Sequence, residues 1–180
     1  MIAAQAAEPA DLADSVAGQA AKVLARARRL GVALVTAESC TGGLVSALLT
    51  DIEGVSGAFE RGFAVYSNAA KQTMLGIDAS LIASFGAVSR EVATAMAAGA
   101  LAHSEGDLAV AITGFAGPAG KSDEEGLVYL AGKSKQGHAI QRECHVGAVG
   151  RDRVRELATR GALEIFGELL DLCRPEQGRL

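Results

Sequence analysis

V-A-L-V-T-A-E-S-C-T-G-G-L-V-S-A-L-L, residues 32–49, is the segment that most directly indicates the fold class. Its first four residues form a continuous apolar run, which is typical of a strand buried on both faces. Positions 44, 45, 48 and 49 are apolar at helical spacing and predict a helix that ends near Asp51. Since a polar turn with Gly42 and Gly43 lies between these parts, the stretch predicts a strand, a turn and a helix.

The rest of the chain continues this alternation of strands and helices. Apolar residues at helical spacing predict a helix over 11–30, which Gly31 ends. Asn68 and Ser89 are placed to cap the helices that follow them. The other expected elements are strands at 59–67, 107–113, 126–132 and 138–146, and helices at 69–75, 90–103 and 151–172. Because Gly137 joins the last two strands as a hairpin, we expect a layered α/β domain with a mixed sheet.

The composition is that of a globular protein with one domain, which we place at residues 11–172. Of 180 residues, 49% are apolar and 21% are charged, and this length supports one core. Residues 1–10 and 175–180 are expected to be flexible termini. The net charge is −4, aromatic residues make up 4% and tryptophan is absent. We therefore expect no nucleic acid and no anionic membrane surface as a partner.

The cysteines and the apolar runs indicate a reducing compartment. Cys40, Cys144 and Cys173 lack the spacing of a disulfide framework or of a zinc site. No apolar run approaches the roughly 20 residues of a membrane helix. The first ten residues lack the basic start of a signal peptide. We expect a cytoplasmic protein with no metal and no membrane partner.

Three polar or glycine-rich segments follow directly after predicted strands, at residues 38–43, 66–71 and 113–120. Ligands of open α/β sheets bind at the carboxyl ends of strands. The convergence of these three loops predicts a ligand site, and it does so without reference to any family.

The first loop places Ser39 near a helix amino terminus. Free backbone amides and the helix dipole favour negative charge there, either an oxyanion or a phosphate. Gly42 and Gly43 would let a ligand approach the backbone closely. The alternative is an ordinary helix cap with glycines used for packing.

The second loop brings Tyr66 and Lys71. A lysine in the first turn of a helix faces positive potential, which should lower its pKa. A neutral lysine can accept the proton of a serine hydroxyl, and Tyr66 could relay that proton. The alternative is a solvated surface lysine.

The third loop, T-G-F-A-G-P-A-G, could cradle a phosphate or carbonyl with backbone amides, and Thr113 adds a hydroxyl. Its alternative is a wide turn.

The last predicted helix begins with three arginines, at positions 151, 153 and 155. They are candidate phosphate ligands, and the alternative is a solvated charged face. The histidines lie outside the three loops, which argues against a Ser–His–Asp triad. Cys40 is a second candidate nucleophile, although a packing role is expected for it.

Four segments resemble the C-terminal domain of the competence/damage-inducible protein CinA. They read T-A-E-S-C-T-G-G (36–43), V-Y-S-N-A-A-K (65–71), G-A-V-S-R-E-V-A (86–93) and A-I-T-G-F-A-G-P (111–118). Several segments in the family's order are far more specific than any one of them. Weaker likeness runs over residues 11–172.

The resemblance implies a three-layer α/β/α fold with a mixed, mostly parallel sheet. It implies hydrolysis of the carboxamide of nicotinamide mononucleotide, a small-molecule nucleotide, to nicotinic acid mononucleotide and ammonia, with no metal or cofactor. Ser39 matches the family's nucleophile, and Lys71 and Tyr66 match its proton-handling pair. The implied substrate-binding residues are Thr41, Gly42, Gly43, Thr113, Gly114, Gly117 and, as alternatives for the phosphate, Arg151 or Arg155.

Two features depart from the family pattern. Residues 121–126, K-S-D-E-E-G, form a shorter and more acidic loop than usual, which bears on substrate affinity. The nucleotide pyrophosphatase domain of longer members is absent, so that activity is not expected. Two alternatives stay open: a non-catalytic nucleotide-binding module of the same fold, and an amidohydrolase for another carboxamide. The apolar composition and the family resemblance also leave a homodimer open.

Overall fold

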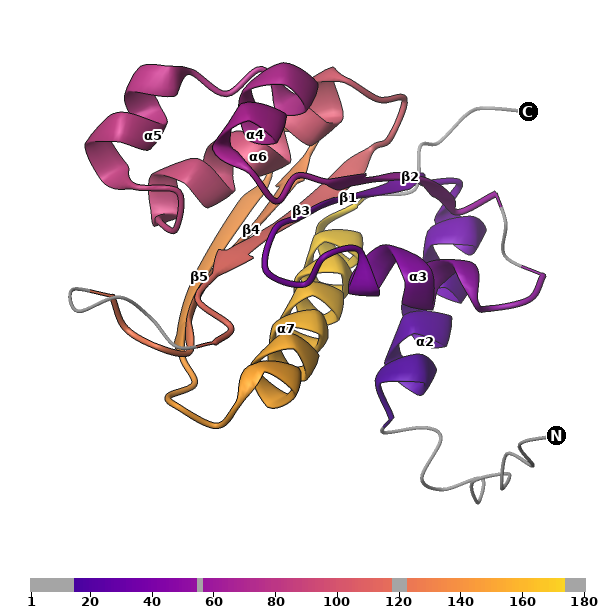
Figure 1. Ribbon diagram of the computed structural model, residues 1–180. Coiled ribbons are helices and arrows are strands. Elements are labelled where there is room, and N and C mark those ends of the chain that lie inside the picture. Colours follow the sequence, from indigo (N-terminus) through magenta and orange to yellow (C-terminus); the bar gives the residue numbers. More distant parts are fainter. Residues whose placement is uncertain (1–14, 55–56, 118–122, 174–180) are drawn as a thin grey trace, which may run out of the picture.

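The computed structural model describes residues 15–54, 57–117 and 123–173, and its five strands form one sheet (Figure 1). The sheet order is β2-β1-β3-β4-β5. The strands are β1 (Leu34–Glu38), β2 (Phe59–Ala64), β3 (Leu108–Gly114), β4 (Leu127–Ser134) and β5 (Ala139–His145). The helices are α2 (Val16–Leu30), α3 (Leu44–Thr50), α4 (Asn68–Leu75), α5 (Ala79–Phe85), α6 (Arg90–Ala102) and α7 (Arg151–Leu172).

The strand directions bring the carboxyl ends of β1, β2, β3 and β5 to one edge of the sheet. β1 pairs in parallel with β2 and β3, and Glu38 at its end is in register with Ala64 and Ile112. β4 runs antiparallel to both β3 and β5, so four of the five strands share a direction. The predicted mixed, mostly parallel sheet and its late hairpin are confirmed.

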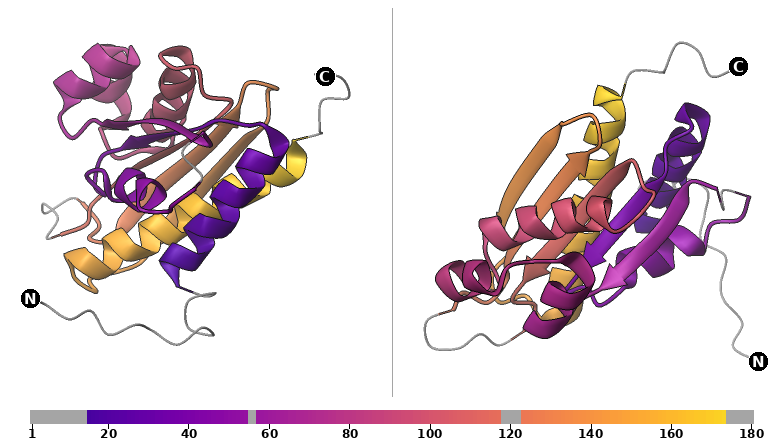
Figure 2. Two further views of the ribbon diagram at one scale, coloured as in Figure 1. Left: turned by 90° about the vertical axis from the view of Figure 1, so that its right-hand side faces the viewer. Right: turned by 90° about the horizontal axis from the view of Figure 1, so that it is seen from above.

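Helices cover both faces of the sheet, with α2, α3 and α7 on one face and α4, α5 and α6 on the other (Figure 2). Successive side chains of a strand point to opposite faces. Accordingly, Leu34 belongs to the core that includes Leu24 and Phe166, whereas Val35 belongs to the core that includes Met96. Every residue of β1 is buried. The three-layer α/β/α arrangement is therefore confirmed.

Several element boundaries differ from the predicted ones. β1 continues past the apolar run 32–35 to Glu38, because Thr36 finds a polar partner: its Oγ1 lies 2.6 Å from Ser46 Oγ. The cap of α4 is Ser67, whose side chain accepts a hydrogen bond from the Ala70 amide at 3.0 Å. The prediction of Asn68 as that cap is wrong, since this residue already belongs to the helix.

Two further predicted features are confirmed, and one helix was not predicted. The bounds of α7 are confirmed, and Ser89 caps α6 as predicted. Sequence reasoning missed α5, a seven-residue helix whose cap, Asp78, accepts from the Ser80 amide at 2.8 Å. The predicted helix start at 11–14, both predicted flexible termini and residues 118–122 lie outside the described residues.

Candidate active site

A serine and a lysine from two loops meet at the carboxyl edge of the sheet. Ser39 directly follows β1, and Lys71 lies near the start of α4. Lys71 Nζ lies 2.9 Å from Ser39 Oγ and donates a hydrogen bond to the Val65 carbonyl oxygen at 3.0 Å. Only 8% of Ser39 and 1% of Lys71 are exposed. The alternative of a solvated surface lysine is therefore wrong.

The environment of Lys71 favours its neutral form. Burial lowers the pKa of the ammonium group from its ordinary 10.5, because the charged form loses hydration in the interior. The predicted direction is thus confirmed, although desolvation rather than the helix dipole is the main cause. A neutral amine can donate to the Val65 carbonyl while its lone pair accepts the Ser39 proton. A serine and a lysine placed in this way can act as a nucleophile and its base.

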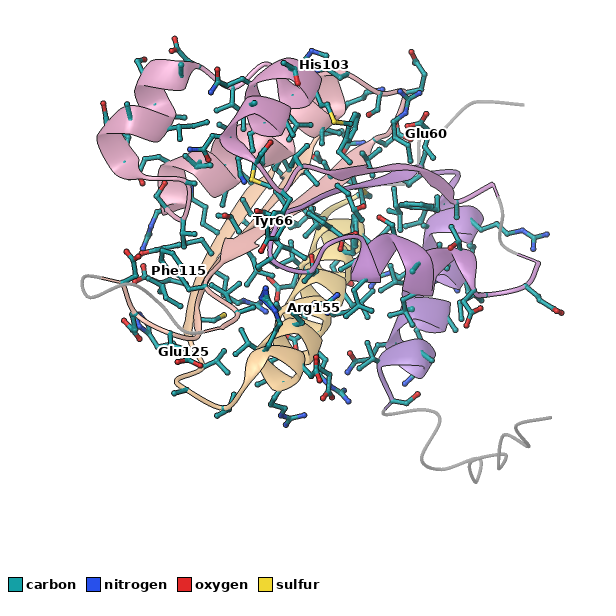
Figure 3. All side chains as sticks on the ribbon, viewed as in Figure 1. Glu60, Tyr66, His103, Phe115, Glu125 and Arg155 are labelled. Atoms are coloured by element: carbon teal, nitrogen blue, oxygen red, sulfur yellow. The ribbon has the colours of Figure 1, made fainter. Side chains whose placement is uncertain are left out.

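A cavity of about 400 Å³ opens over this pair, and all three predicted loops contribute to its wall. Ser39 and Cys40 come from the first loop and Tyr66 from the second, while Phe115 lies in the third (Figure 3). The residues predicted to bind substrate that line the cavity are Thr113, Gly114, Gly117 and Arg151. Ala87, Val88 and Ala116 also line the cavity.

Tyr66 stands at the rim rather than between the serine and the lysine. Its side chain is 69% exposed, and Arg151 Nη2 lies 3.5 Å from its hydroxyl oxygen. Because Lys71 reaches Ser39 directly, proton transfer between them needs no intervening group. The structure thus brings Tyr66 to the cavity beside Arg151, where it can contact a bound molecule.

The two arginines predicted as alternatives for a phosphate have different surroundings. Arg151 lines the cavity. Arg155 does not line it, and its Nη2 donates to the Thr41 carbonyl oxygen at 2.8 Å (Figure 3). Arg155 therefore stabilises the loop after Ser39, whereas Arg151 is placed to bind an anion in the cavity.

Thr41, Gly42 and Gly43 do not line the cavity. Thr41 is fully buried, the Gly42 amide donates to the Ser39 carbonyl oxygen at 3.1 Å, and the Gly43 amide donates to Glu38 Oε2 at 3.1 Å. Both glycines have positive φ, +65° and +97°. Glycine is needed here for a turn that other residues rarely adopt, and the close approach of a ligand at these residues stays a prediction.

Thr113 joins the third loop to the segment before α6. It is fully buried, and its Oγ1 donates to the Ala87 carbonyl oxygen at 2.8 Å. This bond holds two parts of the cavity wall together, so the predicted hydroxyl is present at the site with an internal partner.

Sequence reasoning missed Glu38, the residue before Ser39. Glu38 is 1% exposed, and its carboxylate accepts hydrogen bonds from the amides of Gly43, Val45 and Ser46. The available signal was a charged residue between a buried strand and a glycine pair, since an acid is rarely buried without partners.

Cys40 is buried beside Ser39, with 8% exposed, and burial raises the pKa of its thiol to about 11. The thiolate is the reactive form of cysteine. We therefore expect Cys40 to resist iodoacetamide at pH 7.5 and Cys40→Ala to keep wild-type activity. Peptide mapping after alkylation checks this, and rapid labelling of Cys40 together with loss of activity in the alanine variant would restore it as the nucleophile.

The described ranges 15–54, 57–117 and 123–173 contain no group of three or more His, Cys, Asp or Glu side chains that could hold a metal ion. Over the same ranges, no helix has both the length and the apolar character needed to cross a bilayer.

Comparison with known proteins extends these observations. Residues 16–170 match the CinA C-terminal domain. The chain is 48% identical over 137 residues to the nicotinamide-nucleotide amidohydrolase PncC of Escherichia coli (strain K12), which covers 74% of this chain and 82% of that protein. It is 43% identical over 139 residues to a CinA-like protein of Geobacter sulfurreducens, which covers 76% of this chain and 33% of that protein.

Solved structures agree with the sequence comparisons. The competence/damage inducible protein CihA of Agrobacterium tumefaciens has a TM-score of 0.84 at 40% identity, covering 93% of this chain and 99% of that chain. A CinA superfamily protein of Escherichia coli has a TM-score of 0.82 at 30% identity, covering 92% of this chain and 94% of that chain. The resemblance read from the four segments is confirmed, and the chain belongs to the CinA C-terminal domain family.

Proposed function

We propose that this chain hydrolyses the carboxamide of nicotinamide mononucleotide to nicotinic acid mononucleotide and ammonia. The observation that carries the proposal is the 2.9 Å contact between Ser39 Oγ and Lys71 Nζ in the wall of the cavity. The 48% identity to PncC supports the substrate. The absence of acidic side chains among the described lining residues supports an anionic ligand.

In the proposed reaction, neutral Lys71 accepts the Ser39 proton as Oγ bonds to the carboxamide carbon. The tetrahedral intermediate then breaks its C–N bond, and Lys71 returns the proton to the departing nitrogen, which leaves as ammonia. Water attacks the acyl-enzyme, gives a proton to Lys71, and the C–Oγ bond breaks. Ser39 recovers its proton from Lys71, which restores the enzyme.

The hydrogen bonds of the first loop limit which backbone amide can donate to the oxyanion. The amides of Gly42 and Gly43 have partners within the chain. Cys40 lines the cavity directly after the nucleophile. An amide in that position commonly forms part of an oxyanion hole, so we assign this role to the Cys40 backbone.

Arg151 is the proposed ligand of the substrate phosphate. We expect Arg151→Ala to raise the KM for nicotinamide mononucleotide by about 10- to 100-fold, the loss typical of a charge-assisted hydrogen bond. The kcat should change little, because the phosphate is remote from the reacting carbonyl. Steady-state ammonia release over a range of substrate concentrations measures both constants.

Arg153→Ala is the matched control for this substitution. Arg153 lies two residues along the same helix, is exposed, and pairs with Glu156 at 2.8 Å. We expect its KM to stay within about twofold of wild type, since exposed ion pairs contribute little. Equal KM increases in both variants would show that general surface charge, and not a phosphate contact at Arg151, governs binding.

Ammonia release from nicotinamide mononucleotide by the purified, metal-free protein tests the function itself. Nicotinamide riboside and nicotinamide serve as analogues without the phosphate. Release from the nucleotide well above both analogues is expected. Binding measured by calorimetry without ammonia release would indicate the non-catalytic module, and equal release from nicotinamide would indicate another carboxamide as the substrate.

A further inference from the structure

The carboxylate of Glu38 occupies the amino terminus of α3. Glu38 Oε2 accepts from the amides of Gly43 at 3.1 Å and Val45 at 3.0 Å. Glu38 Oε1 accepts from the Ser46 amide at 2.8 Å and from Ser46 Oγ at 2.7 Å. A helix start leaves such amides without intrahelical partners, and the cap residue Gly43 has no side chain to serve them. Glu38 therefore reaches across the turn to do so.

The same contacts join three elements around the nucleophile. Ser46 Oγ on α3 lies 2.6 Å from Thr36 Oγ1 on β1. Gly62 on β2 closes over this pair, since a Cβ added there would lie 2.1 Å from Ser46 Oγ and 2.9 Å from Thr36 Oγ1. The close approach requires glycine, because a distance of 2.1 Å is far shorter than van der Waals contact. Glu38 is thus held by a packed polar group and not by solvent.

We propose that Glu38 is a positioning residue that sets the geometry of the Ser39 nucleophile, an inference that rests on the proposed role of Ser39. Glu38 precedes Ser39 and ties residues 43–46 back to the end of β1, so residues 39–42 must form a closed turn. This turn presents Ser39 Oγ to Lys71 Nζ at 2.9 Å. Glu38 does not line the cavity, so it acts through the turn and not on the substrate.

The arrangement also limits what the helix start can bind. A helix amino terminus often holds a phosphate or an oxyanion. Here the Glu38 carboxylate already accepts hydrogen bonds from the amides of Gly43, Val45 and Ser46. An external anion would have to displace it, which leaves the phosphate to Arg151 at the rim of the cavity.

Glu38→Gln tests this inference. Glutamine keeps the size but offers one oxygen acceptor and one donor group. The glutamine N–H group then faces at least one backbone N–H donor, either that of Ser46 or those of Gly43 and Val45, and the turn must shift. A shift of about 1 Å in a reacting group can cost about 100-fold in rate. We expect kcat to fall at least about tenfold while KM changes by less than about threefold.

A second readout is independent of the natural substrate. Phenylmethylsulfonyl fluoride sulfonylates an activated serine hydroxyl, with loss of fluoride, and intact mass spectrometry follows the modification of Ser39. We expect Glu38→Gln to slow this reaction at least about tenfold, because its rate depends on the placement and activation of the same hydroxyl. If the wild type is labelled but releases no ammonia from the nucleotide, the proposed substrate fails while the inference on Glu38 is still tested.

Asp107→Asn is the matched control. Asp107 also binds a backbone amide beside β1, that of Ala33 at 2.9 Å, but at the opposite end of the strand. Both variants are assayed well below their melting temperatures. We expect slow labelling in Glu38→Gln alone. Wild-type labelling in Glu38→Gln, or equal slowing in Asp107→Asn, would overturn the inference. If Glu38→Gln does not fold, Ser46→Ala removes one of the four hydrogen bonds to Glu38, and an unchanged labelling rate in that variant would overturn it as well.

Discussion

Ammonia release from nicotinamide mononucleotide is expected to fall by about 10⁴-fold or more when Ser39 is replaced with alanine. The substitution removes the atom that we propose forms the covalent bond, and no other hydroxyl is held by Lys71 among the described residues. Cys40 is a poor replacement, because burial raises the pKa of its thiol to about 11. Initial rates with a large excess of the variant enzyme, followed by ammonia detection, measure the residual activity.

The fold should survive this change, because Ser39→Ala removes one oxygen and leaves the backbone bond from the Ser39 amide to the Ile112 carbonyl at 2.9 Å. Ser104→Ala is a matched control: its hydroxyl donates to the Ala100 carbonyl at 2.6 Å, outside the cavity. We expect full activity from this control. A tenth or more of wild-type activity in Ser39→Ala, with its melting temperature unchanged, would contradict the role of Ser39 as the nucleophile.

The architecture can be predicted from local patterns of apolar and polar residues in the sequence. Continuous apolar runs marked the two central strands, because both faces of β1 and β3 are buried. The polar loops that follow these strands were expected at one edge, since parallel strands place their carboxyl ends together. Ser39 and Lys71 belong to these loops, so the sequence predicts that they lie at one site, and their 2.9 Å separation is what folding adds.

The parts that could not be predicted depend on contacts between segments distant in the sequence. Arg151 and Arg155 share a helix and a charge, yet only tertiary packing turns Arg155 toward the Thr41 carbonyl and leaves Arg151 at the cavity. The bonds of Glu38 to the amides of Val45 and Ser46 form only when the turn after β1 closes. The family resemblance implies that Tyr66 handles protons together with Lys71, but Lys71 contacts Ser39 directly and Tyr66 is largely exposed.

Lys71→Met should separate activity from stability. Loss of a general base reduces rates by about 10²- to 10⁴-fold, whereas methionine fills a similar apolar volume. Below the lowered pKa the folded wild type must hold a buried ammonium, so the full cost of burial is present. Between that pKa and 10.5, the amine is neutral in the folded protein but still largely protonated in the unfolded chain. As the pH rises toward 10.5 the unfolded chain loses this proton as well, and the cost of burial to the folding free energy disappears. The methionine variant should therefore be more stable than wild type at neutral pH, by a margin that shrinks in alkali.

Urea unfolding of both proteins from pH 6 to pH 10 measures this margin, and wild-type kcat/KM over the same range should rise as Lys71 becomes neutral, with its midpoint below 10.5. Lys71→Arg is the control for charge, because a guanidinium keeps the charge and does not deprotonate in proteins. Its inactivity would show that Lys71 serves as a base and not as a fixed cation. Activity that stays constant with pH, or an active Lys71→Arg variant, would instead mean that a positive charge next to Ser39 is what the reaction requires.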